Sequence, residues 1–160
     1  MNEFCFIESP IGVLKLEAES DCISKIKFKD GDSLKLRKES RHNGKSSILI
    51  QTSKQINEYF NGTRKVFEIP FKLNLPPFYT KVLLEVKKIK YGEVASYGKI
   101  AKMVGNNEAV RAVGTANAKN PLPIIIPCHR IISWNGKLGG YSGGLDKKSF
   151  LLEHESNLLH

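Results

Sequence analysis

The chain of 160 residues is long enough for one domain or two small ones, and a composition of 41% hydrophobic and 26% charged residues excludes a disordered protein. No apolar run approaches the roughly 20 residues that a membrane-spanning helix needs, and the N-terminus lacks the basic region and apolar core of a signal peptide. We therefore expect a protein without membrane association, located in the cytoplasm, or in the nucleus if the source is a eukaryote.

Positive charge is in excess and unevenly distributed. There are 25 Lys and Arg residues against 16 Asp and Glu residues, which gives a formal net charge of +9. Most of the excess lies in residues 76–160, and between Tyr97 and Lys137 the only acidic residue is Glu108. This distribution fits a surface that binds nucleic acid, although charge alone equally fits a lysine-rich solubilising surface.

The first half of the chain is patterned as strands followed by a helix. Residues 3–29 alternate in three runs, EFCFIES, VLKLEAE and CISKIKF, which predict an antiparallel meander with one buried face. The polar residues 29–45 have no clean period and fit either a further strand or a loop. A helix is then predicted from Ser46 or Ser47 to Phe60, because apolar residues recur at helical spacing and NGT supplies a stop.

The proline-containing segment IPFKLNLPP predicts an extended connector, because proline lacks an amide donor and disfavours helical geometry in the residue before it. The chain is therefore divided into an N-terminal α/β structural domain, residues 1–75, and a C-terminal domain, residues 76–160.

Short helices dominate the predicted second domain. One places Val82, Leu83, Val86 and Ile89 on a single face, with Thr80 as a candidate cap. The helix in SYGKIAKMVG is predicted to begin after the cap Ser96 and to end at Gly105, and Asn106 or Asn107 is the predicted cap of the next helix. Two short helices around a tight turn match a helix-turn-helix, although such pairs occur in any helical bundle. A last helix has Asp146 as its predicted cap and packs Phe150 and either Leu151 or Leu152 inward.

The stretch PIIIPCHRII places Cys128 directly before His129 and Arg130. A lone cysteine of this kind is most often a small buried apolar residue. A nucleophilic cysteine, however, needs a neighbouring base or a positive field, and His129 and Arg130 offer both types of group. A histidine base needs an orienting carboxylate, for which Glu153 and Glu155 are candidates. Adjacency alone establishes no direct hydrogen bond, so a water can link the two side chains.

These residues belong to a larger pattern, because GEVASYGKIA, RAVGTANAKNP, IPCHRII and NGKLGGYSGGLDKKSFLLEHE occur in this order. Together they closely resemble the O6-alkylguanine-DNA alkyltransferase family, almost continuously from Phe78 to Glu155, whereas residues 1–75 match mainly in layout. The resemblance implies an α+β fold. A small N-terminal α/β domain with an antiparallel, ribonuclease-H-like sheet would precede a mostly helical domain that carries a DNA-binding helix-turn-helix.

The resemblance also implies an activity, that of a methylated-DNA–[protein]-cysteine S-methyltransferase. Such a protein repairs DNA by direct reversal: it flips the damaged base and transfers the alkyl group of O6-alkylguanine, and of O4-alkylthymine, irreversibly to its own cysteine. The implied partner is double-stranded DNA, bound through its minor groove by a helix over residues 107–118, where weak base readout suits scanning. The implied protein is a monomer and needs no cofactor.

The family's functional residues carry over one at a time. Cys128 resembles the nucleophile, His129 its water-mediated base and Glu155 the carboxylate that orients the histidine. Tyr97 resembles the proton donor to the departing guanine, and Asn120 supports the turn before the active site. Arg111 matches the finger that replaces the extruded nucleotide. The implied substrate pocket contains Asn117, Tyr141 and Ser142, and further DNA contacts are implied for Tyr97, Ala112, Gly114, Thr115 and Arg130.

Two departures from the family pattern are visible. Some relatives hold a structural zinc through two cysteines and two histidines; Cys5 and Cys22 are present here, but Ser24 lies near one expected histidine and PFKLNLPP offers none for the other. We therefore predict no metal, and a disulfide framework is not expected from three cysteines in a reducing compartment, although a contact between Cys5 and Cys22 stays open. Asn117 stands at a pocket-wall position that is apolar in some relatives, which leaves open how well bulky alkyl groups fit.

Two other functions use some of the same residues. One is a binder of damaged DNA without enzymatic activity, as in relatives that lack the cysteine, and the presence of Cys128 argues against it. The other is a thiol hydrolase, which would use Cys, His and Glu in the same way but would need neither a finger arginine nor a helix-turn-helix.

Overall fold

The computed structural model describes residues 3–29 and 46–157. The chain divides into two compact units, Met1–Leu73 and Asn74–His160. Apart from Lys29, the polar segment predicted as a strand or a loop lies outside the described residues.

The first unit contains the predicted antiparallel meander. Strands β1 (Glu3–Ser9), β2 (Gly12–Glu19) and β3 (Cys22–Lys29) pair in the order β1-β2-β3. The register sets apolar residues opposite one another, as in the pairs Ile7↔Leu14 and Leu16↔Ile26. One face of the sheet is therefore apolar and buried, as the alternating sequence predicts.

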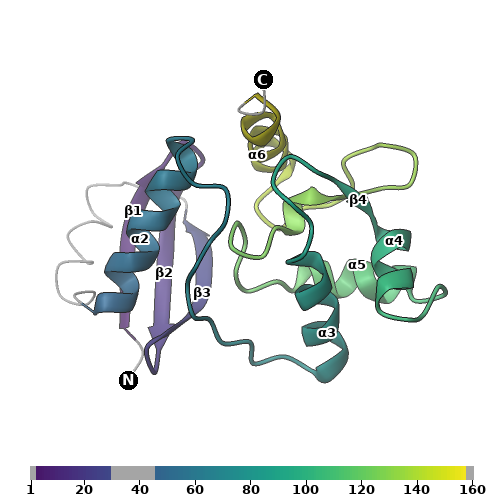
Figure 1. The fold of residues 1–160 in the computed structure, drawn as a ribbon, viewed down its shortest axis with the longest axis horizontal. Helices are drawn as coiled ribbons and strands as arrows, with labels where there is room; N and C mark the ends of the chain where they lie inside the picture. The colour runs from purple at the N-terminus through teal and green to yellow at the C-terminus, as the bar shows by residue number, and fades with distance from the viewer. Residues whose placement is uncertain (1–2, 30–45, 158–160) are drawn as a thin grey trace. The chain divides into compact units, whose positions relative to one another are not determined.

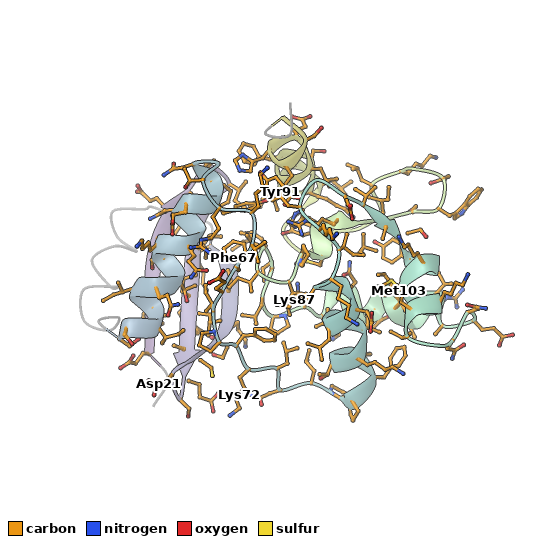
Figure 2. All side chains as sticks on the ribbon, viewed as in Figure 1. Asp21, Phe67, Lys72, Lys87, Tyr91 and Met103 are labelled. Atoms are coloured by element: carbon orange, nitrogen blue, oxygen red, sulfur yellow. The ribbon has the colours of Figure 1, made fainter. Side chains whose placement is uncertain are left out.

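Helix α2 (Ser47–Phe60) covers this apolar face (Figure 1). It begins and ends within the predicted bounds, and Leu49, Ile56 and Tyr59 are fully buried. The Tyr59 ring also packs on Phe67, labelled in Figure 2, with 5.6 Å between the ring centroids. The connector then runs beside β3, because the Ile23 amide donates to the Pro70 carbonyl and the Lys72 amide donates to the Ile23 carbonyl, both at 3.0 Å.

The second unit is built on three short helices, α3 (Pro77–Val86), α4 (Tyr97–Met103) and α5 (Val110–Ala118), which pack on one another. Ser96 caps α4 as predicted, since its hydroxyl accepts a hydrogen bond from the Lys99 amide at 3.0 Å. Gly105 has a φ of +85° just beyond this helix, a conformation that favours glycine. Together with the sheet of the first unit, these helices confirm the predicted α+β class.

Two predicted helix starts are wrong. Helix α3 begins at Pro77, because proline suits the first turn, and the Thr80 hydroxyl donates to the Leu75 carbonyl inside the helix. Helix α5 begins at Val110, with Ala109 rather than Asn106 or Asn107 at the cap. The Asn106 side chain does accept a backbone hydrogen bond, but it comes from Glu108 and closes a turn ahead of the helix.

The remaining elements hold the Cys-His pair. A short 3-10 turn, η1 (Cys128–Arg130), leads into strand β5 (Ile131–Ile132), which pairs in parallel with β4 (Ala95–Ser96). Helix α6 (Leu145–Asn157) follows and contacts η1. None of the helices in the described part of the chain is long and apolar enough to cross a bilayer.

The start and the inner face of α6 differ in part from the prediction. Asp146 lies in the first turn rather than at the cap. Leu151 is fully buried as predicted, but Phe150 is 37% exposed and stacks on His154 with 6.0 Å between the ring centroids. The inward prediction for Phe150 was therefore wrong.

Candidate active site

The segment before Cys128 is a strained turn that one buried amide spans. Ile124 has a φ of +77°, a region that β-branched residues rarely adopt. Asn120 Oδ1 accepts a hydrogen bond from the Leu122 amide at 2.9 Å, and Asn120 Nδ2 donates to the Ile126 carbonyl at 2.8 Å. Because both ends of the turn are bonded to Asn120, the strained conformation is retained and Cys128 is positioned.

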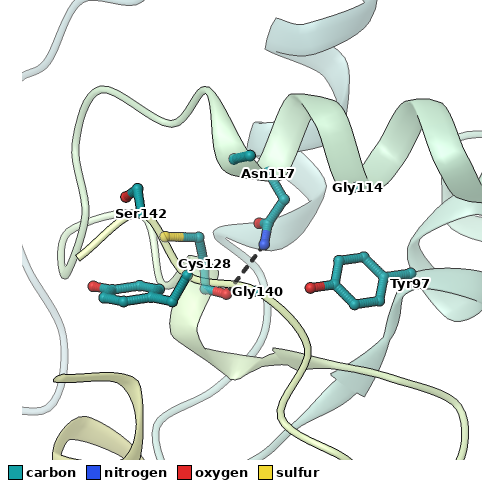
Figure 3. A pocket seen from close by; sticks show the side chains of 8 residues that line it. Tyr97, Gly114, Asn117, Cys128, Gly140 and Ser142 are labelled. Carbon is teal, nitrogen blue, oxygen red and sulfur yellow. Dashed lines mark hydrogen bonds between the residues drawn. The ribbon is translucent and has the colours of Figure 1, made fainter. Parts of the chain in front are cut away.

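Cys128 begins the turn η1 and is only 3% exposed. Its carbonyl accepts a hydrogen bond from Asn117 Nδ2 at 3.2 Å (Figure 3). Burial raises the pKa of the Cys128 thiol to about 11, while a hydrogen bond from Asn120 and the charge of Lys148 act in the opposite direction. The resting group is therefore a protonated thiol at neutral pH, and a base is needed to make it nucleophilic.

His129 is oriented as a neutral base. Its Nε2 lies 2.7 Å from Glu155 Oε2, and both side chains are buried. Burial would raise the pKa of Glu155, but hydrogen bonds from His129 and Arg130 hold it well below its usual value. Burial lowers the pKa of His129, and Glu155 opposes that shift. An ionised Glu155 accepts only, so Nε2 carries the proton. Nδ1, which has no hydrogen-bond partner among the described residues, is then the basic nitrogen.

Arg130, which is predicted to contact DNA, has a buried side chain in this structure. It is only 6% exposed, and its Nε and Nη2 donate to the two carboxylate oxygens of Glu155 at 2.7 and 3.0 Å. Its Nη1 donates to the Ile89 carbonyl at 2.6 Å, and the Tyr91 ring centroid lies 5.6 Å away. The guanidinium is thus fully engaged inside the fold, and its charge is paired with Glu155.

Lys148 on α6 is a site residue that the sequence reasoning missed. Its side chain is fully buried, and Nζ donates to the carbonyls of Ile131 at 2.6 Å and Gly140 at 3.1 Å. Burial lowers the pKa of Lys148 to about 8, and the Cys128 thiol opposes this shift. One signal was available, because Lys148 shares a helical face with Leu151 and Glu155.

A cavity of about 350 Å³ opens beside the thiol (Figure 3). It brings together four residues predicted for catalysis or the pocket, Tyr97, Asn117, Tyr141 and Ser142, with Cys128. Gly114, Ala118 and Gly140 complete the lining. The walls come from the first turn of α4, one face of α5 and the glycine-rich loop before α6. A partly apolar cavity of this size with a few convergent polar groups suits one flat aromatic ring.

Tyr97 points its hydroxyl into this cavity (Figure 3). Burial raises the pKa of Tyr97, with an opposing hydrogen bond from the Gly140 backbone, so the hydroxyl stays protonated and can donate. A Cβ added at Gly139, where φ is +70°, would lie 2.8 Å from the Tyr97 oxygen. Glycine at this position therefore lets the loop close on Tyr97.

Three further predicted residues lie outside the cavity on α5. Arg111, Ala112 and Thr115 are exposed, and the Thr115 hydroxyl donates to the Arg111 carbonyl at 3.2 Å. The same helix supplies Gly114 and Asn117 to the cavity. One helix thus presents exposed side chains next to a wall of the pocket.

Comparison with known proteins identifies the family. Residues 77–157 match the 6-O-methylguanine DNA methyltransferase, DNA binding domain, and residues 4–73 match the ribonuclease-like domain of the same proteins. The chain belongs to the 6-O-methylguanine DNA methyltransferase family. A methylated-DNA–protein-cysteine methyltransferase from Methanosarcina acetivorans is 39% identical over 96% of this chain and 98% of its own. The constitutive methylated-DNA–protein-cysteine methyltransferase from Bacillus subtilis is also 39% identical, over 97% of this chain and 96% of its own.

Solved structures agree with this assignment. The crystal structure of Mycobacterium tuberculosis O6-methylguanine methyltransferase has a TM-score of 0.84 and 35% identity, covering 98% of this chain and 94% of that one. The M. tuberculosis OGT protein in complex with DNA has a TM-score of 0.84 and 34% identity, over 97% and 93%. These likenesses span both compact units.

The sequence predicts no metal in this chain and leaves a contact between Cys5 and Cys22 open. Within residues 3–29 and 46–157, no cluster of three or more His, Cys, Asp or Glu side chains could hold a metal ion. Cys5, Cys22 and Cys128 are free thiols, and Cys5 Sγ lies 3.8 Å from the Ser53 hydroxyl.

The buried network predicts how stability depends on pH. Glu155 has a depressed pKa in the folded state, so its contribution is present above its unfolded pKa of about 4.3 and is lost as the pH falls further. Glu155→Gln should lower the free energy of unfolding by about 3 to 5 kcal/mol at pH 7, because Arg130 is left buried without its counterion. The further decrease in the free energy of unfolding between pH 5 and pH 3 should then be smaller in Glu155→Gln than in the wild type.

Urea unfolding followed by circular dichroism at several pH values measures both effects. Glu153→Gln is the matched control, since Glu153 is exposed on the same helix. Similar small losses in the two variants would contradict a structural role for the Glu155 carboxylate.

Proposed function

We propose that this protein repairs DNA by direct reversal, moving the alkyl group of O6-alkylguanine in double-stranded DNA onto Cys128, once per molecule. The observation that carries the proposal is a buried thiol beside a cavity of about 350 Å³, faced by the Tyr97 hydroxyl and followed by a His129–Glu155 pair 2.7 Å apart. Relatives named for this activity match almost the whole chain, which supports the same reaction here.

The proposed reaction balances with these side chains. The Cys128 proton passes through a water to His129 Nδ1, and Glu155 stabilises the imidazolium. The sulfur attacks the alkyl carbon, the bond from that carbon to the guanine oxygen breaks, and its electron pair stays on the base. Tyr97 donates its proton to the departing guanine and regains one from the imidazolium through solvent. The products are guanine and an S-alkyl cysteine.

The DNA would be engaged by α4 and α5 as a helix-turn-helix in the minor groove. Extruding a base leaves a gap in the stack, and Arg111 is exposed on α5, where a long cation can fill that gap. Ala112, Gly114 and Thr115 on the same helix would contact the strand, and phosphate contacts would supply most of the affinity. O4-alkylthymine, a smaller base, would be a second substrate.

The rest of the proposal concerns organisation. All of these groups lie in residues 76–160, so residues 1–75 are assigned a structural role. We propose a monomer that needs no cofactor and acts in the cytoplasm, or in the nucleus of a eukaryote.

Stoichiometry separates this function from a DNA-binding protein and from a thiol hydrolase. A thioether is a poor leaving group, so transfer should stop at one alkyl group per protein. Mass spectrometry after incubation with excess O6-methylguanine duplex should show one added methyl group on the Cys128 peptide. Cys128→Ser should abolish transfer and keep most DNA affinity, because a buried thiol would contribute little to contacts with the DNA backbone. Sustained turnover would point to a hydrolase, and an unmodified wild type that still binds would point to a simple binder.

Arg111 separates extrusion from chemistry. Arg111→Ala should slow transfer from duplex DNA by roughly 10- to 1,000-fold, because the compensation for unstacking, on the order of a few kcal/mol, is lost. Transfer from free O6-benzylguanine, which needs no extrusion, should change little. Arg111→Lys should recover only part, since lysine lacks the planar fork. Single-turnover kinetics measure the two transfer rates, one at saturating duplex and one with the free base. Equal slowing on both substrates would contradict the proposal that Arg111 fills the gap in the base stack.

Lys148 tests the electrostatics of the thiol. Lys148→Met removes the charge that lowers the pKa of Cys128, so transfer should slow about tenfold for each unit by which that pKa rises. Because Lys148 itself has a pKa of about 8, it loses its charge above pH 8, and the difference in transfer rate between wild type and variant should become smaller there. Lys148→Arg should keep most of the rate at neutral pH.

Single-turnover rates with free O6-benzylguanine between pH 6 and pH 9 provide the measurement, and Lys147→Met on the same helix is the control. A merely structural role would lower the rate of Lys148→Met by the same factor at every pH.

A further inference from the structure

The most exposed large apolar side chain among the described residues is Trp134, at 89%. It is also the sole tryptophan of the chain. Indole is a large apolar group with a polar N–H, and proteins commonly use it at binding surfaces. The proposed reaction assigns it no role.

Trp134 stands on a defined turn. The Ser133 amide donates to the Lys137 carbonyl at 2.9 Å, and the Gly136 amide donates back to the Ser133 carbonyl at 3.0 Å. Asn135 Oδ1 accepts a hydrogen bond from the Lys137 amide at 3.1 Å, and Gly136 has a φ of +82°. These bonds fix the backbone on both sides of Trp134, so the turn holds the indole out toward solvent at a defined point of the chain.

The base of this turn joins the active-site pocket. In the parallel pair of β4 and β5, Ser96 lies opposite Ile132, so the next residues along, Tyr97 and Ser133, emerge side by side. A Cβ at Gly139 would lie 2.8 Å from the Tyr97 oxygen and 3.4 Å from Ser133 Oγ. Ser133, Gly139 and Tyr97 thus meet at the pocket wall, and Trp134 is the residue directly after Ser133.

The charge around the turn favours one occupant. Residues 131–140 include Lys137 and no acidic residue, within a longer stretch whose only acid is Glu108. A basic turn with an exposed aromatic ring suits nucleic acid, because lysine meets the phosphates and every nucleotide offers a face for the ring. A strand whose base entered the pocket would pass Tyr97, which lines the pocket.

We infer that Trp134 is a DNA contact that packs against the strand next to the extruded nucleotide. This inference rests on the proposed function. An aromatic ring needs no particular base, so the contact would add affinity without restricting the sequence that is scanned. It would also hold the strand at the pocket mouth while the damaged base is turned inward.

Two measurements on the full chain test this contact. Titration with an unmodified duplex should change the fluorescence of Trp134, which reports this side chain alone. Trp134→Ala should weaken duplex affinity by about 5- to 100-fold, the usual range for losing one aromatic–base contact, and Trp134→Phe should restore most of it. The salt dependence of binding should stay unchanged in Trp134→Ala, whereas Lys137→Ala should lower its slope by about 0.9.

The controls separate the remaining outcomes. Val66→Ala, at a site 66% exposed in the other compact unit, should leave affinity unchanged. Transfer from free O6-benzylguanine should stay within about twofold in Trp134→Ala, since the free base has no flanking strand. This inference alone is overturned if the wild type becomes methylated on Cys128 but its fluorescence does not change with duplex DNA and Trp134→Ala binds the duplex equally tightly. A wild type that is not methylated would overturn the proposed function. Emission that changes with protein concentration in the absence of DNA would assign Trp134 to a contact between copies and overturn the inference.

Discussion

The carboxylate of Glu155 is the group on which the second unit depends most. It accepts hydrogen bonds from His129, from two nitrogens of Arg130 and, at 3.4 Å, from the Gly92 amide. It thereby joins α6 to the turn that carries Cys128 and to the loop after α3. A buried carboxylate is stable only when all of its partners are present, so the set forms or fails together. The same bond that holds the helix also fixes which nitrogen of His129 is basic.

Cys128 shows the opposing effects of burial and charge. Burial keeps the thiol protonated, and the nearby Arg130 does not counter this because its charge is matched by Glu155. Lys148, which bonds two carbonyls of the same neighbourhood, is the cation that favours the thiolate. A protein that can react only once benefits from a thiol of low resting reactivity, because unrelated electrophiles then consume fewer molecules. His129 would take the Cys128 proton only when a substrate lies next to the sulfur.

Local patterns predicted much of this fold, because they report on short-range physics. Alternation predicted the meander, periodicity predicted α2, and the Ser96 cap depends on a hydrogen bond three residues away. What these patterns do not predict is contact between residues distant in sequence, whereas the wrong starts of α3 and α5 have local causes. Arg130 is buried because Glu155, 25 residues later, reaches it. Lys148 is buried because carbonyls of other segments accept hydrogen bonds from its ammonium group. Phe150 is 37% exposed, although its spacing in the helix predicted an inward position. The sequence motif places Cys128, His129 and Glu155 in one family pattern. Only the distances in the structure show that the imidazole proton of His129 is on Nε2.

Strain and close approach are concentrated where the pocket is made. Ile124 keeps an unfavourable φ because Asn120 bonds both ends of its turn, and Gly139 lets its loop approach Tyr97 more closely than any side chain would allow. Ile124 is itself only 1% exposed, so its burial offsets part of this cost, and both features act on geometry. The first sets the position of the sulfur, and the second sets that of the phenol across the cavity. The loop that contains Gly139 continues from the turn that carries Trp134. Contact between DNA and the indole would therefore affect the backbone that packs against Tyr97, and strand binding would be coupled to the proton donor.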